Sequence, residues 1–413
     1  MTQAIFAGCY RSLFEDLPPL RSDVSALHAL GRPGGVCDLG ERVVENTDSE
    51  VAAVWPFFGQ FLAHDLTADR SPLVDRADTA RIHNFRAPRA NLEALYGNGP
   101  VGEPYLYAAD DPAKLLLAPS GIDVPRNHEG IALIGDPRND ANLFTSQLAV
   151  AFIGLHNRFV DRLRADRIPE AKVYEAARRE TTWHFQHVIL REFLPGLIGG
   201  ELTAELLEDG PQLYRIDPDD PYIPLEFADA AYRYGHAQIR DRYQVNASFG
   251  PVPVFPDLMG FGPVPPERRV DWALQFAQRA KRIDARLPAS LISLPRAISG
   301  AAPGTDYASL ATRDLQRGHA VGLPSGEAVA RRLGVEVLEP VEIGLGWEET
   351  PLWFYVLKEA EVLGGGNQLG PVGGRIVGEV IVGVIDADPS SFRAVDPSWT
   401  PGAAFGLASV LGV

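Results

Sequence analysis

The sequence is poor in cysteine and lacks a long apolar run. Only two cysteines, Cys9 and Cys37, occur among 413 residues. This excludes a disulfide-rich scaffold and a metal centre held by four thiolates. We expect two reduced thiols, with a Cys9–Cys37 disulfide as the alternative. The longest apolar tract, GAAFGLASVLGV at the C-terminus, is shorter than the about 20 residues that a membrane-spanning helix needs.

Basic residues are also scarce relative to acidic ones. The chain has 38 Lys and Arg against 54 Asp and Glu, a net charge of −16, which would repel nucleic acid and anionic membranes, so we expect neither as a partner. The N-terminal MTQAIFAGCYRSLFEDLPPL has no basic start and soon meets Glu15 and Asp16, unlike a secretory signal. We therefore expect a cytoplasmic protein without a membrane span; leaderless export and the oligomeric state stay open.

Apolar residues, by contrast, are abundant: 46% of the chain is hydrophobic, enough for a large core. The 34 prolines and 40 glycines predict much irregular chain between regular elements. We expect a single, mainly α-helical domain over residues 1–413. It would comprise a loop-rich N-terminal wrap (1–48), a core (49–395) and a C-terminal tail (396–413).

Apolar periodicity, capping residues and Pro or Gly stops predict the helices. They are expected near 51–66, 143–165, 171–193, 225–240, 267–285, 326–333 and 351–363. The helix over 171–193 should end before Pro195, and residues 376–385 could form either a helix or a strand. We expect residues 67–134 to be irregular, and we assign His184 and His187 to packing or to the surface.

Two polar residues interrupt the apolar segment VAAVWPFFGQFLAHDL. Gln60 and His64 are one helical turn apart and share a face. Inside such a segment each needs a hydrogen-bond partner or costs about 1–3 kcal/mol. A cofactor pocket would supply partners; a core histidine bonded to a backbone carbonyl is the alternative. Asp65, rotated by about 100°, needs a neutralising group of its own.

Four segments, in order, carry a resemblance to a known family. They are GQFLAHDLT (59–67), GDPRNDANLFTSQLAVAFIGLHNRFV (135–160), YRYGH (232–236) and LQRGHAVGLPSG (315–326). With REFLPGLIGG and PVGGRIVGEV, they resemble the peroxidase–cyclooxygenase superfamily, the animal-type haem peroxidases, and especially its short bacterial members. The likeness covers most of residues 50–395. It implies a helical bundle around a central haem, with little β-structure.

The resemblance also implies roles for the matched residues. His64 would be the distal histidine that moves a proton between the two oxygens of H2O2, which requires a neutral imidazole. Gln60 would orient peroxide or water, and Arg138 would stabilise developing negative charge; a salt bridge is the alternative for Arg138. His236 would bind the haem iron, and Arg233 belongs to the same cofactor-binding motif. The implied reaction reduces H2O2 while a small phenolic, halide or pseudohalide donor loses one or two electrons.

The sequence departs from the family at the haem-linking positions. Mammalian members bind haem through two carboxylate esters, but the equivalent positions here are Ala63 and Ala141. Asp140 is adjacent to Ala141, yet on a helix it points about 100° away. We therefore expect non-covalent haem b. Without the distortion that the esters impose, chloride oxidation becomes doubtful.

A second departure concerns the partner of the proximal histidine. The family places an asparagine there, and alignment through LQRG and GLP puts Asp314 at this position. A carboxylate would make His236 a stronger electron donor to iron and would lower the reduction potential. The alternative is that Asp314 caps a helix or pairs with Arg313 or Arg317 at the surface.

The family also holds a structural calcium, and this chain matches that site only in part. Asp65 matches one ligand, while Asn91 and Glu93 fall at side-chain ligand positions and Ala87 and Arg89 could offer carbonyls. Oxygen ligands suit Ca2+, so Ca2+ is a possible second cofactor. An ion pair between an arginine and Asp65 is the alternative.

Other functions remain open at this point. Fatty-acid dioxygenases of the same superfamily carry a radical-forming tyrosine three residues before the proximal ligand, where this chain has Arg233, so peroxidase is favoured. A non-catalytic haem-binding protein would be expected to lack His64 or Arg138, and both are present. In a third alternative, a haem-free interaction protein, the histidines would be structural.

Overall fold

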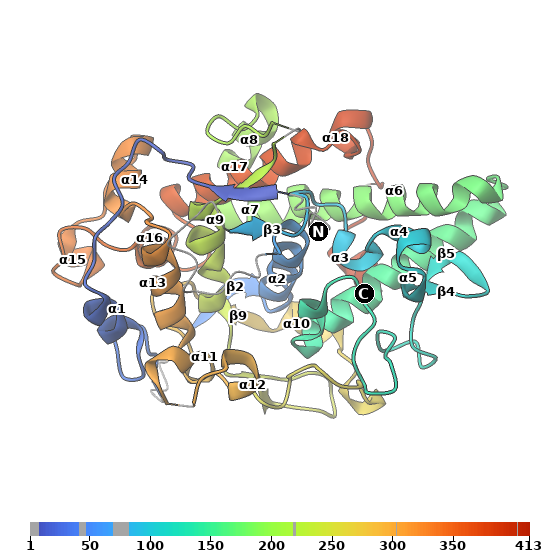
Figure 1. The fold of residues 1–413 in the computed structure, drawn as a ribbon, viewed down its shortest axis with the longest axis horizontal. Coiled ribbons are helices and arrows are strands. Elements are labelled where there is room, and N and C mark those ends of the chain that lie inside the picture. Colours follow the sequence, from blue (N-terminus) through green and yellow to red (C-terminus); the bar gives the residue numbers. More distant parts are fainter. Residues whose placement is uncertain (1–7, 41–46, 69–81, 218–219, 303, 403) are drawn as a thin grey trace, which may run out of the picture.

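The chain folds mainly into helices, as predicted. The structure is a computed structural model that describes residues 8–40, 47–68, 82–217, 220–302, 304–402 and 404–413. About half of the residues are helical and only 9% lie in strands, which confirms the mainly α class (Figure 1). Within the described residues, no helix combines the length and the apolar character that a membrane span requires.

The helices follow one another along the whole chain, separated by long irregular segments. The α-helices are α1 (Val24–Gly31), α2 (Val54–Leu66), α3 (Glu93–Tyr96), α4 (Gly99–Gly102), α5 (Leu143–Ala165), α6 (Glu170–Val188), α7 (Leu194–Ile198), α8 (Gly200–Asp209), α9 (Leu225–Asp229), α10 (Trp272–Ala277), α11 (Ala289–Ile292), α12 (Arg296–Ser299), α13 (Leu310–Ala320), α14 (Gly326–Leu333), α15 (Pro340–Ile343), α16 (Leu352–Leu363), α17 (Pro371–Ala387), α18 (Phe392–Val395) and α19 (Leu407–Leu411). Shorter helical segments include the 3-10 helices η4 (Pro137–Asp140), η6 (Ala231–Gln238) and η7 (Pro266–Arg268) and the π-helical segment η5 (Ile189–Phe193).

The strands are short and serve mainly to join distant segments. They are β1 (Gly8–Arg11), β2 (Asp48–Ala52), β3 (His83–Asn84), β4 (Tyr107–Ala108), β5 (Asp111–Leu115), β6 (Tyr222–Pro224), β7 (Arg242–Tyr243), β8 (Val252–Pro253) and β9 (Arg279–Lys281). One sheet has the order β3-β1-β6, with β1 antiparallel to β3 and parallel to β6. The antiparallel pairs are β2–β9, β4–β5 and β7–β8.

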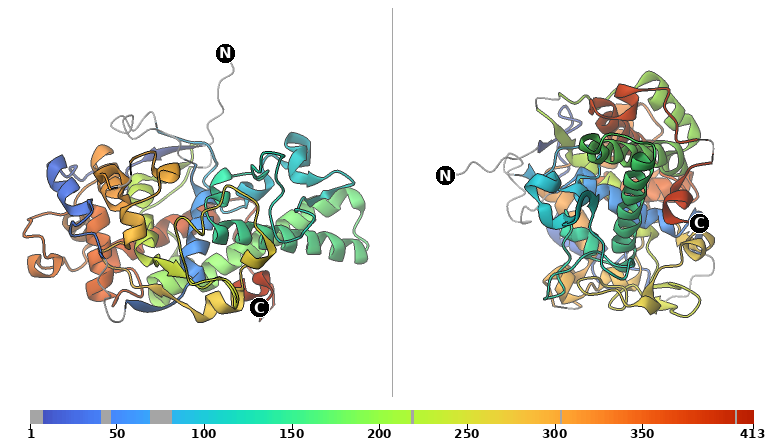
Figure 2. Two further views of the ribbon diagram at one scale, coloured as in Figure 1. Left: turned by 90° about the horizontal axis from the view of Figure 1, so that it is seen from below. Right: turned by 90° about the vertical axis from the view of Figure 1, so that its right-hand side faces the viewer.

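The core contains a cluster of aromatic rings between α2, α5 and α6. Phe61 of α2 stacks on Phe152 of α5, with ring centroids 5.4 Å apart, and Phe185 of α6 meets Phe152 edge-on at 5.3 Å. The long helices α5 and α6 lie side by side (Figures 1 and 2). Asn142 begins α5, because its side chain accepts the N–H of Thr145. The aromatic contacts therefore fix α2 against this helix pair.

Several predicted helices are present with the expected bounds. The observed α5 coincides with the prediction for 143–165, α14 with 326–333, and α16 starts one residue after 351. The ambiguous segment 376–385 is helical, as part of α17.

The predicted helix over 51–66 begins too early. Residues 48–52 form β2 and pair with β9, so the helix begins at Val54. Pro56 then lies in the first turn, as expected, where its missing N–H costs little. The shift leaves Gln60 and His64 within α2, one turn apart.

The prediction that helix 171–193 ends before Pro195 is wrong. After α6 the chain continues through η5 directly into α7, which contains Pro195 in its first turn. The wider π turn accommodates a proline that would interrupt a regular α-helix. The helical path ends at Gly199, whose φ of 86° suits glycine.

Two other predicted helices are broken into shorter pieces. Residues 225–240 form α9 and then η6, which carries His236. Residues 267–285 contain η7 and α10 and then turn into β9. Helices α8 and α13 were not predicted.

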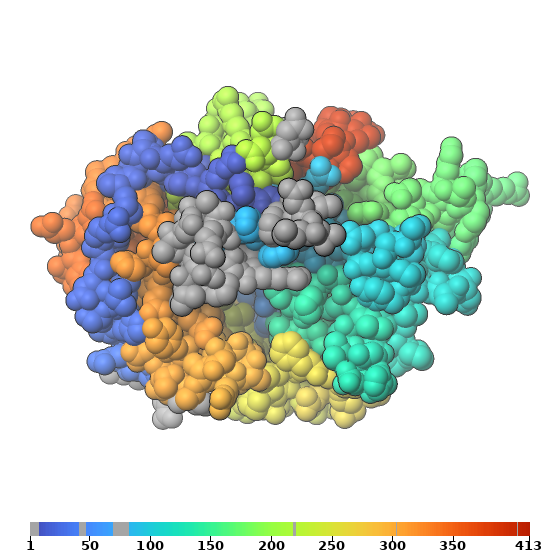
Figure 3. Space-filling view, in the orientation of Figure 1, coloured from blue at the N-terminus to red at the C-terminus, as the bar shows by residue number. Residues whose placement is uncertain are grey.

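The N-terminal segment wraps over the outside of the helical core. Its helix α1 packs on α13, and the hydroxyl of Ser309 donates to the carbonyl of Gly31. Figure 3 shows this segment in blue along α13 and α14. The wrap is less irregular than predicted, since it contains β1 and α1. Residues 1–7 and 41–46 of the predicted wrap lie outside the described residues. So do residues 69–81 of the segment 67–134, which was predicted to be irregular. Cys9 and Cys37 are free thiols.

Candidate active site

Four residues singled out in the sequence line one cavity. It has a volume of about 370 Å3 and is lined by Gln60, His64, Arg138 and His236 together with mostly apolar side chains. Gln60 and His64 come from α2, Arg138 from η4 and His236 from η6. Helix α2 contacts both η4 and η6. Residues far apart in the sequence thus meet in a cavity of the size that usually binds a small molecule or cofactor.

His64 is held in one orientation by a buried hydrogen bond. Its Nδ1 donates to Oδ1 of Asn139 at 2.8 Å, so the neutral ring keeps a lone pair on Nε2. Burial, and then the positive charge of Arg138, lowers the pKa of His64 to about 4. The imidazole is therefore neutral at physiological pH and can accept a proton at Nε2.

Gln60 and Arg138 are oriented by contacts on either side of His64. The amide of Asn142 donates to Oε1 of Gln60 at 3.0 Å. Arg138 forms a salt bridge with buried Asp136 at 2.7 Å and also donates to the carbonyls of His64 and Thr67. The salt bridge named as the alternative for Arg138 is thus present, but the guanidinium lines the cavity as well.

His236 pairs with a buried carboxylate on its other ring nitrogen. Nδ1 of His236 lies 2.6 Å from Oδ2 of Asp314, and Nη1 of Arg233 donates to Oδ1 of Asp314 at 3.1 Å. Asp314 is fully buried in α13. The alternative of a surface pairing for Asp314 is therefore wrong.

The two arginines of that alternative bind elsewhere. Arg313 donates to the carbonyls of Tyr307 and Ser299, and Arg317 pairs with Asp229. In a 3-10 helix, side chains three residues apart eclipse one another, so Arg233 and His236 of η6 project in the same direction. This geometry explains how both reach one carboxylate.

The cavity fits the haem that the resemblance implies. Both His64 and His236 use Nδ1 for hydrogen bonds, and in the described part of the chain neither Nε2 has a hydrogen-bond partner. An imidazole Nε2 is the usual axial ligand atom for haem iron. An added Cβ on Gly235, which also lines the cavity, would meet only open space.

The residues at the haem-linking positions also line the cavity. Ala63 and Ala141 both face it, and neither can form an ester. Asp140 does not line the cavity; its carboxylate binds the guanidinium of Arg126 through two contacts of 2.7 Å. Among the described lining residues there is no Asp or Glu.

The residues of the expected calcium site contact protein groups in this structure. Both oxygens of buried Asp65 accept backbone N–H groups: Oδ2 accepts those of Asn91 at 2.8 Å and Leu92 at 2.7 Å, and Oδ1 accepts that of Ala94 at 3.0 Å. These bonds hold Leu92 at a φ of 59°, which a leucine rarely adopts.

The other expected calcium ligands likewise have protein partners. Oδ1 of Asn91 accepts the N–H of Glu93, and the carbonyl of Ala87 accepts the N–H of Arg89. Oε1 of Glu93 lies 3.4 Å from Nη1 of Arg86. Among the residues that the structure describes, no arginine forms a direct ion pair with Asp65: Arg86 donates instead to Asp136 and to the carbonyl of Gly135. Over the described residues, no cluster of three or more His, Cys, Asp or Glu side chains could hold a metal ion.

Three residues with positioning contacts escaped the sequence interpretation. They are Asp136, Asn139 and Asn142, which hold Arg138, His64 and Gln60 respectively. All three lie within GDPRNDAN, next to Arg138. The density of polar residues there, directly before the apolar α5, was the available signal. By contrast, His184 packs as predicted, against Phe159, Trp399 and Phe405.

Comparisons with known proteins agree with this geometry. Residues 102–342, more than half of the chain, match the family model described as animal haem peroxidase. The chain is 28% identical to chorion peroxidase of Drosophila melanogaster over 258 residues, covering 56% of this chain and 31% of that protein. It is 27% identical to thyroid peroxidase of Sus scrofa over 165 residues, covering 40% of this chain and 18% of that protein. Both alignments thus span less than a third of the relative's length.

Solved structures share the fold over nearly the whole chain. Peroxidase A from Dictyostelium discoideum superimposes with a TM-score of 0.73 and 15% identity, covering 99% of this chain and 93% of that one. A fatty acid alpha-dioxygenase from Arabidopsis thaliana gives a TM-score of 0.63 at 15% identity, covering 91% of this chain and 71% of that one. At such identities the likeness concerns the fold.

The contacts of Asp65 generate a test of metal dependence. Asp65→Ala would leave three backbone N–H groups without an acceptor and should lower the free energy of unfolding by about 3 kcal/mol or more. Asp23→Ala, which removes an exposed helix cap at α1, should cost only about 1 kcal/mol. Thermal unfolding of wild type should not change when EGTA or Ca2+ is added. A midpoint that falls with EGTA and recovers with Ca2+ would contradict this interpretation.

Proposed function

This chain belongs to the animal haem peroxidase family, and on that basis we propose that it reduces H2O2 at a bound haem and oxidises a small electron donor. The family implies haem as the cofactor. The observation that carries the proposal is the pair of imidazoles, His64 and His236. Each is fixed through Nδ1 and each has an Nε2 without a partner in the described structure, and both line one cavity with Arg138 and Gln60.

The two histidines would have different roles because the hydrogen-bond partners of their Nδ1 atoms differ. His236 would bind the haem iron through Nε2, since its Nδ1 is paired with the carboxylate of Asp314. His64 is paired with a neutral amide and has a lowered pKa, so it suits proton transfer. When bound, haem supplies an iron centre that takes oxidising equivalents from H2O2 and passes them to donors.

The distal residues would then handle the proton and the charge of peroxide. Nε2 of His64 would accept a proton from one peroxide oxygen and return it to the other, which leaves as water. The guanidinium of Arg138 would stabilise the negative charge that develops as the O–O bond breaks. Gln60, held by Asn142, would orient peroxide or water between them.

We propose that the haem is haem b and is bound without covalent links. Ala63 and Ala141 line the cavity, and the carboxylate of Asp140 is paired with Arg126. None of these three residues therefore offers a carboxylate that could form an ester with haem. We also propose that Asp65 secures the loop before α3 through amide groups instead of through Ca2+. Residues 1–413 would act as one domain, in keeping with a hydrophobic cluster that extends from Tyr10 to Val410.

Phenols, iodide, bromide or thiocyanate are the donor classes that we propose, with chloride disfavoured. With haem bound, the carboxylate of Asp314 would increase electron donation from His236 and so would lower the reduction potential of the iron. The dioxygenase alternative is not favoured, although a structural relative has that activity in its name. Arg233, at the position of the dioxygenase tyrosine, is committed to Asp314 and to the carbonyl of Ala228.

Substitution of the two histidines should separate haem binding from peroxide chemistry. His236→Ala should release haem, measured by titrating the purified protein with haem and following its absorption. His64→Ala should keep haem, but its rate of reaction with H2O2 should fall by a factor of about 100 or more, because the variant lacks the proton acceptor. His128→Ala, at an exposed histidine, is the matched control. If both site variants keep full turnover, the proposed function is wrong.

The lowered pKa of His64 predicts the pH dependence of the reaction with H2O2. The imidazole accepts a proton only when neutral, so the rate should fall as the pH drops through the pKa of about 4. An unperturbed histidine would instead lose this ability near pH 6.5. Stopped-flow rates should therefore stay flat between about pH 7 and pH 5. A midpoint of the acid limb near 6.5 would contradict the buried, neutral state of His64.

Asp314→Asn should raise the reduction potential of the bound haem. The amide can still accept the N–H of His236, but it removes the negative charge that strengthens electron donation. Spectroelectrochemical titration measures the potential directly. Asp306→Asn, at a carboxylate that pairs with His28, should leave it unchanged. An equal potential in wild type and Asp314→Asn would exclude this role for Asp314.

A further inference from the structure

A second cavity adjoins the first and has no role in the proposed peroxide chemistry. Its volume is about 560 Å3. Residues from several parts of the chain line it. They are Glu50, Val51 and Ala52 of β2, Trp55 of α2, Glu192 and Phe193 of η5, Gly196 and Leu197 of α7, Tyr234 and Gln238 of η6, Arg279 of β9, and Gly364, Asn367 and Gln368 after α16. We call it the Trp55 cavity. It is large enough for a small organic molecule.

Two deeply buried polar side chains in this cavity have no protein partner. Tyr234 and Gln238 are each 2% exposed. Neither the Tyr234 hydroxyl nor the Gln238 carboxamide forms a hydrogen bond within the described structure. Both residues line the cavity, and their polar atoms keep some accessible surface. A buried polar group left without a partner costs about 1–3 kcal/mol. Two such groups facing one cavity indicate that a polar ligand completes them.

Two aromatic side chains, Trp55 and Phe193, also line the Trp55 cavity. The Trp55 and Phe193 rings are tilted by 35° with centroids 6.1 Å apart, and Trp55 is only half-buried. A flat aromatic ring packs well against such side chains. A phenol combines this ring with a hydroxyl that can both donate to Gln238 Oε1 and accept from the hydroxyl of Tyr234.

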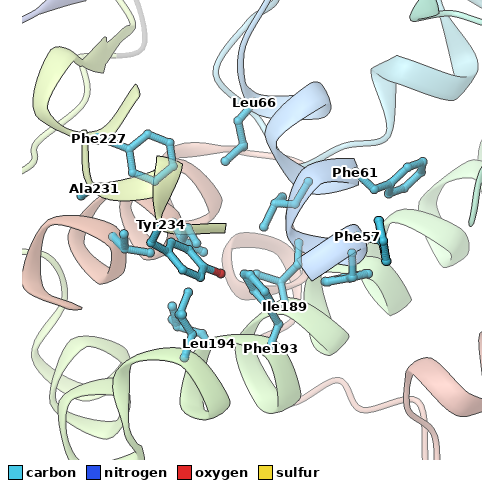
Figure 4. Close-up of a cluster of buried hydrophobic side chains, with 14 of the residues drawn as sticks. Phe57, Phe61, Leu66, Ile189, Phe193, Leu194, Phe227, Ala231 and Tyr234 are labelled. Atoms are coloured by element: carbon cyan, nitrogen blue, oxygen red, sulfur yellow. The ribbon is translucent and has the colours of Figure 1, made fainter. Parts of the chain in front are cut away.

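Tyr234 is also shared between the two cavities. It lines the cavity with His64 and His236 as well as the Trp55 cavity. Figure 4 shows its hydroxyl directed towards α2 and Phe193. A Cβ added to Gly59 of α2 would lie 3.6 Å from this hydroxyl oxygen and 3.2 Å from the Phe193 ring. Because Gly59 has no side chain, the hydroxyl of Tyr234 lies close to the backbone of α2 at a residue that also lines the first cavity.

We propose that the Trp55 cavity binds phenolic electron donors and that Tyr234 passes their electrons to the first cavity, where haem would bind. This inference rests on the proposed function. Each phenol loses one electron and one proton from its O–H bond and becomes a phenoxyl radical. Tyr234 would first have lost an electron to the oxidant formed from H2O2 and its hydroxyl proton to an oxygen that becomes water. It regains an electron and a proton from the phenol and restores its O–H bond. Two phenols supply the two electrons that, with two protons, reduce H2O2 to two waters.

Binding of 4-methylphenol to the haem-loaded protein tests the ligand site. Calorimetry should detect binding to wild type, and 4-methylanisole, which lacks the O–H donor, should bind about tenfold more weakly. Gln238→Leu should weaken 4-methylphenol binding by about the same factor, whereas Gln212→Leu, at an exposed glutamine, should not. Gly196→Leu is a second variant, because its side chain would extend into open space at the cavity and should block binding without removing a polar group.

Electron spin resonance tests the electron path through Tyr234. Haem-loaded wild type mixed with H2O2 should show a tyrosyl radical that 4-methylphenol quenches. In Tyr234→Phe this signal should be absent and the 4-methylphenol oxidation rate should fall about tenfold or more, an effect of about 1.4 kcal/mol. Tyr105→Phe, at a surface tyrosine bonded to Glu103, should keep the signal. Haem absorption must match wild type in every variant compared.

The outcomes separate this inference from the proposed function. If H2O2 and donors turn over but 4-methylphenol binds equally to wild type, Gln238→Leu and Gly196→Leu, the Trp55 cavity is not the donor site. If the radical persists in Tyr234→Phe, the electron path is wrong. If 4-methylphenol binds as expected yet no donor turns over with H2O2, the proposed function fails, and with it the electron path.

Discussion

The hydrogen bond between His236 and Asp314 is the contact on which the candidate active site depends. It joins η6 to α13 and brings a charge into a fully buried position. An unpaired charge there would cost several kcal/mol, so Arg233 is as necessary as the histidine. The 3-10 winding of η6 meets this need, because it projects residues 233 and 236 in the same direction. The same winding turns Tyr234, two residues before His236, towards a different side, where the second cavity lies.

The part of the cavity around His64 is organised by one short segment. Asp136, Asn139 and Asn142 lead into α5, and each holds one of the polar residues that face the cavity. Because α5 is packed against α2 through stacked phenyl rings, this segment is joined to the helix that carries His64. The two walls therefore depend on different anchors: a buried ion pair on the side of His236, and amide and carboxylate contacts to the core helices on the side of His64.

The sequence allowed the strongest periodic elements and the key pairs of the site to be predicted, and its failures have physical causes. Helices α5 and α14 follow from local spacing and capping alone. The start of α2 was misplaced because β2 pairs with β9, some 230 residues away, and local spacing carries no such information. The path through Pro195 was missed because a π turn accommodates it. The pairing of Asp314 with His236 came from alignment to the family. The contacts of Asn139 with His64, and of Asp65 with the backbone of residues 91–94, join segments that are far apart in the sequence, and local spacing does not specify them.

The departures from the family at the haem share one direction. In the proposed site, Ala63 and Ala141 would offer no carboxylate for a covalent link, and the carboxylate of Asp314, 2.6 Å from Nδ1 of His236, would increase electron donation from that imidazole. Both changes would make the bound haem a milder oxidant. A milder oxidant is suited to donors that give up an electron easily, and phenols do so more readily than chloride. A site for an aromatic donor beside Tyr234 would suit such a haem, since it would bring an easily oxidised molecule to a side chain that also lines the cavity with His64 and His236.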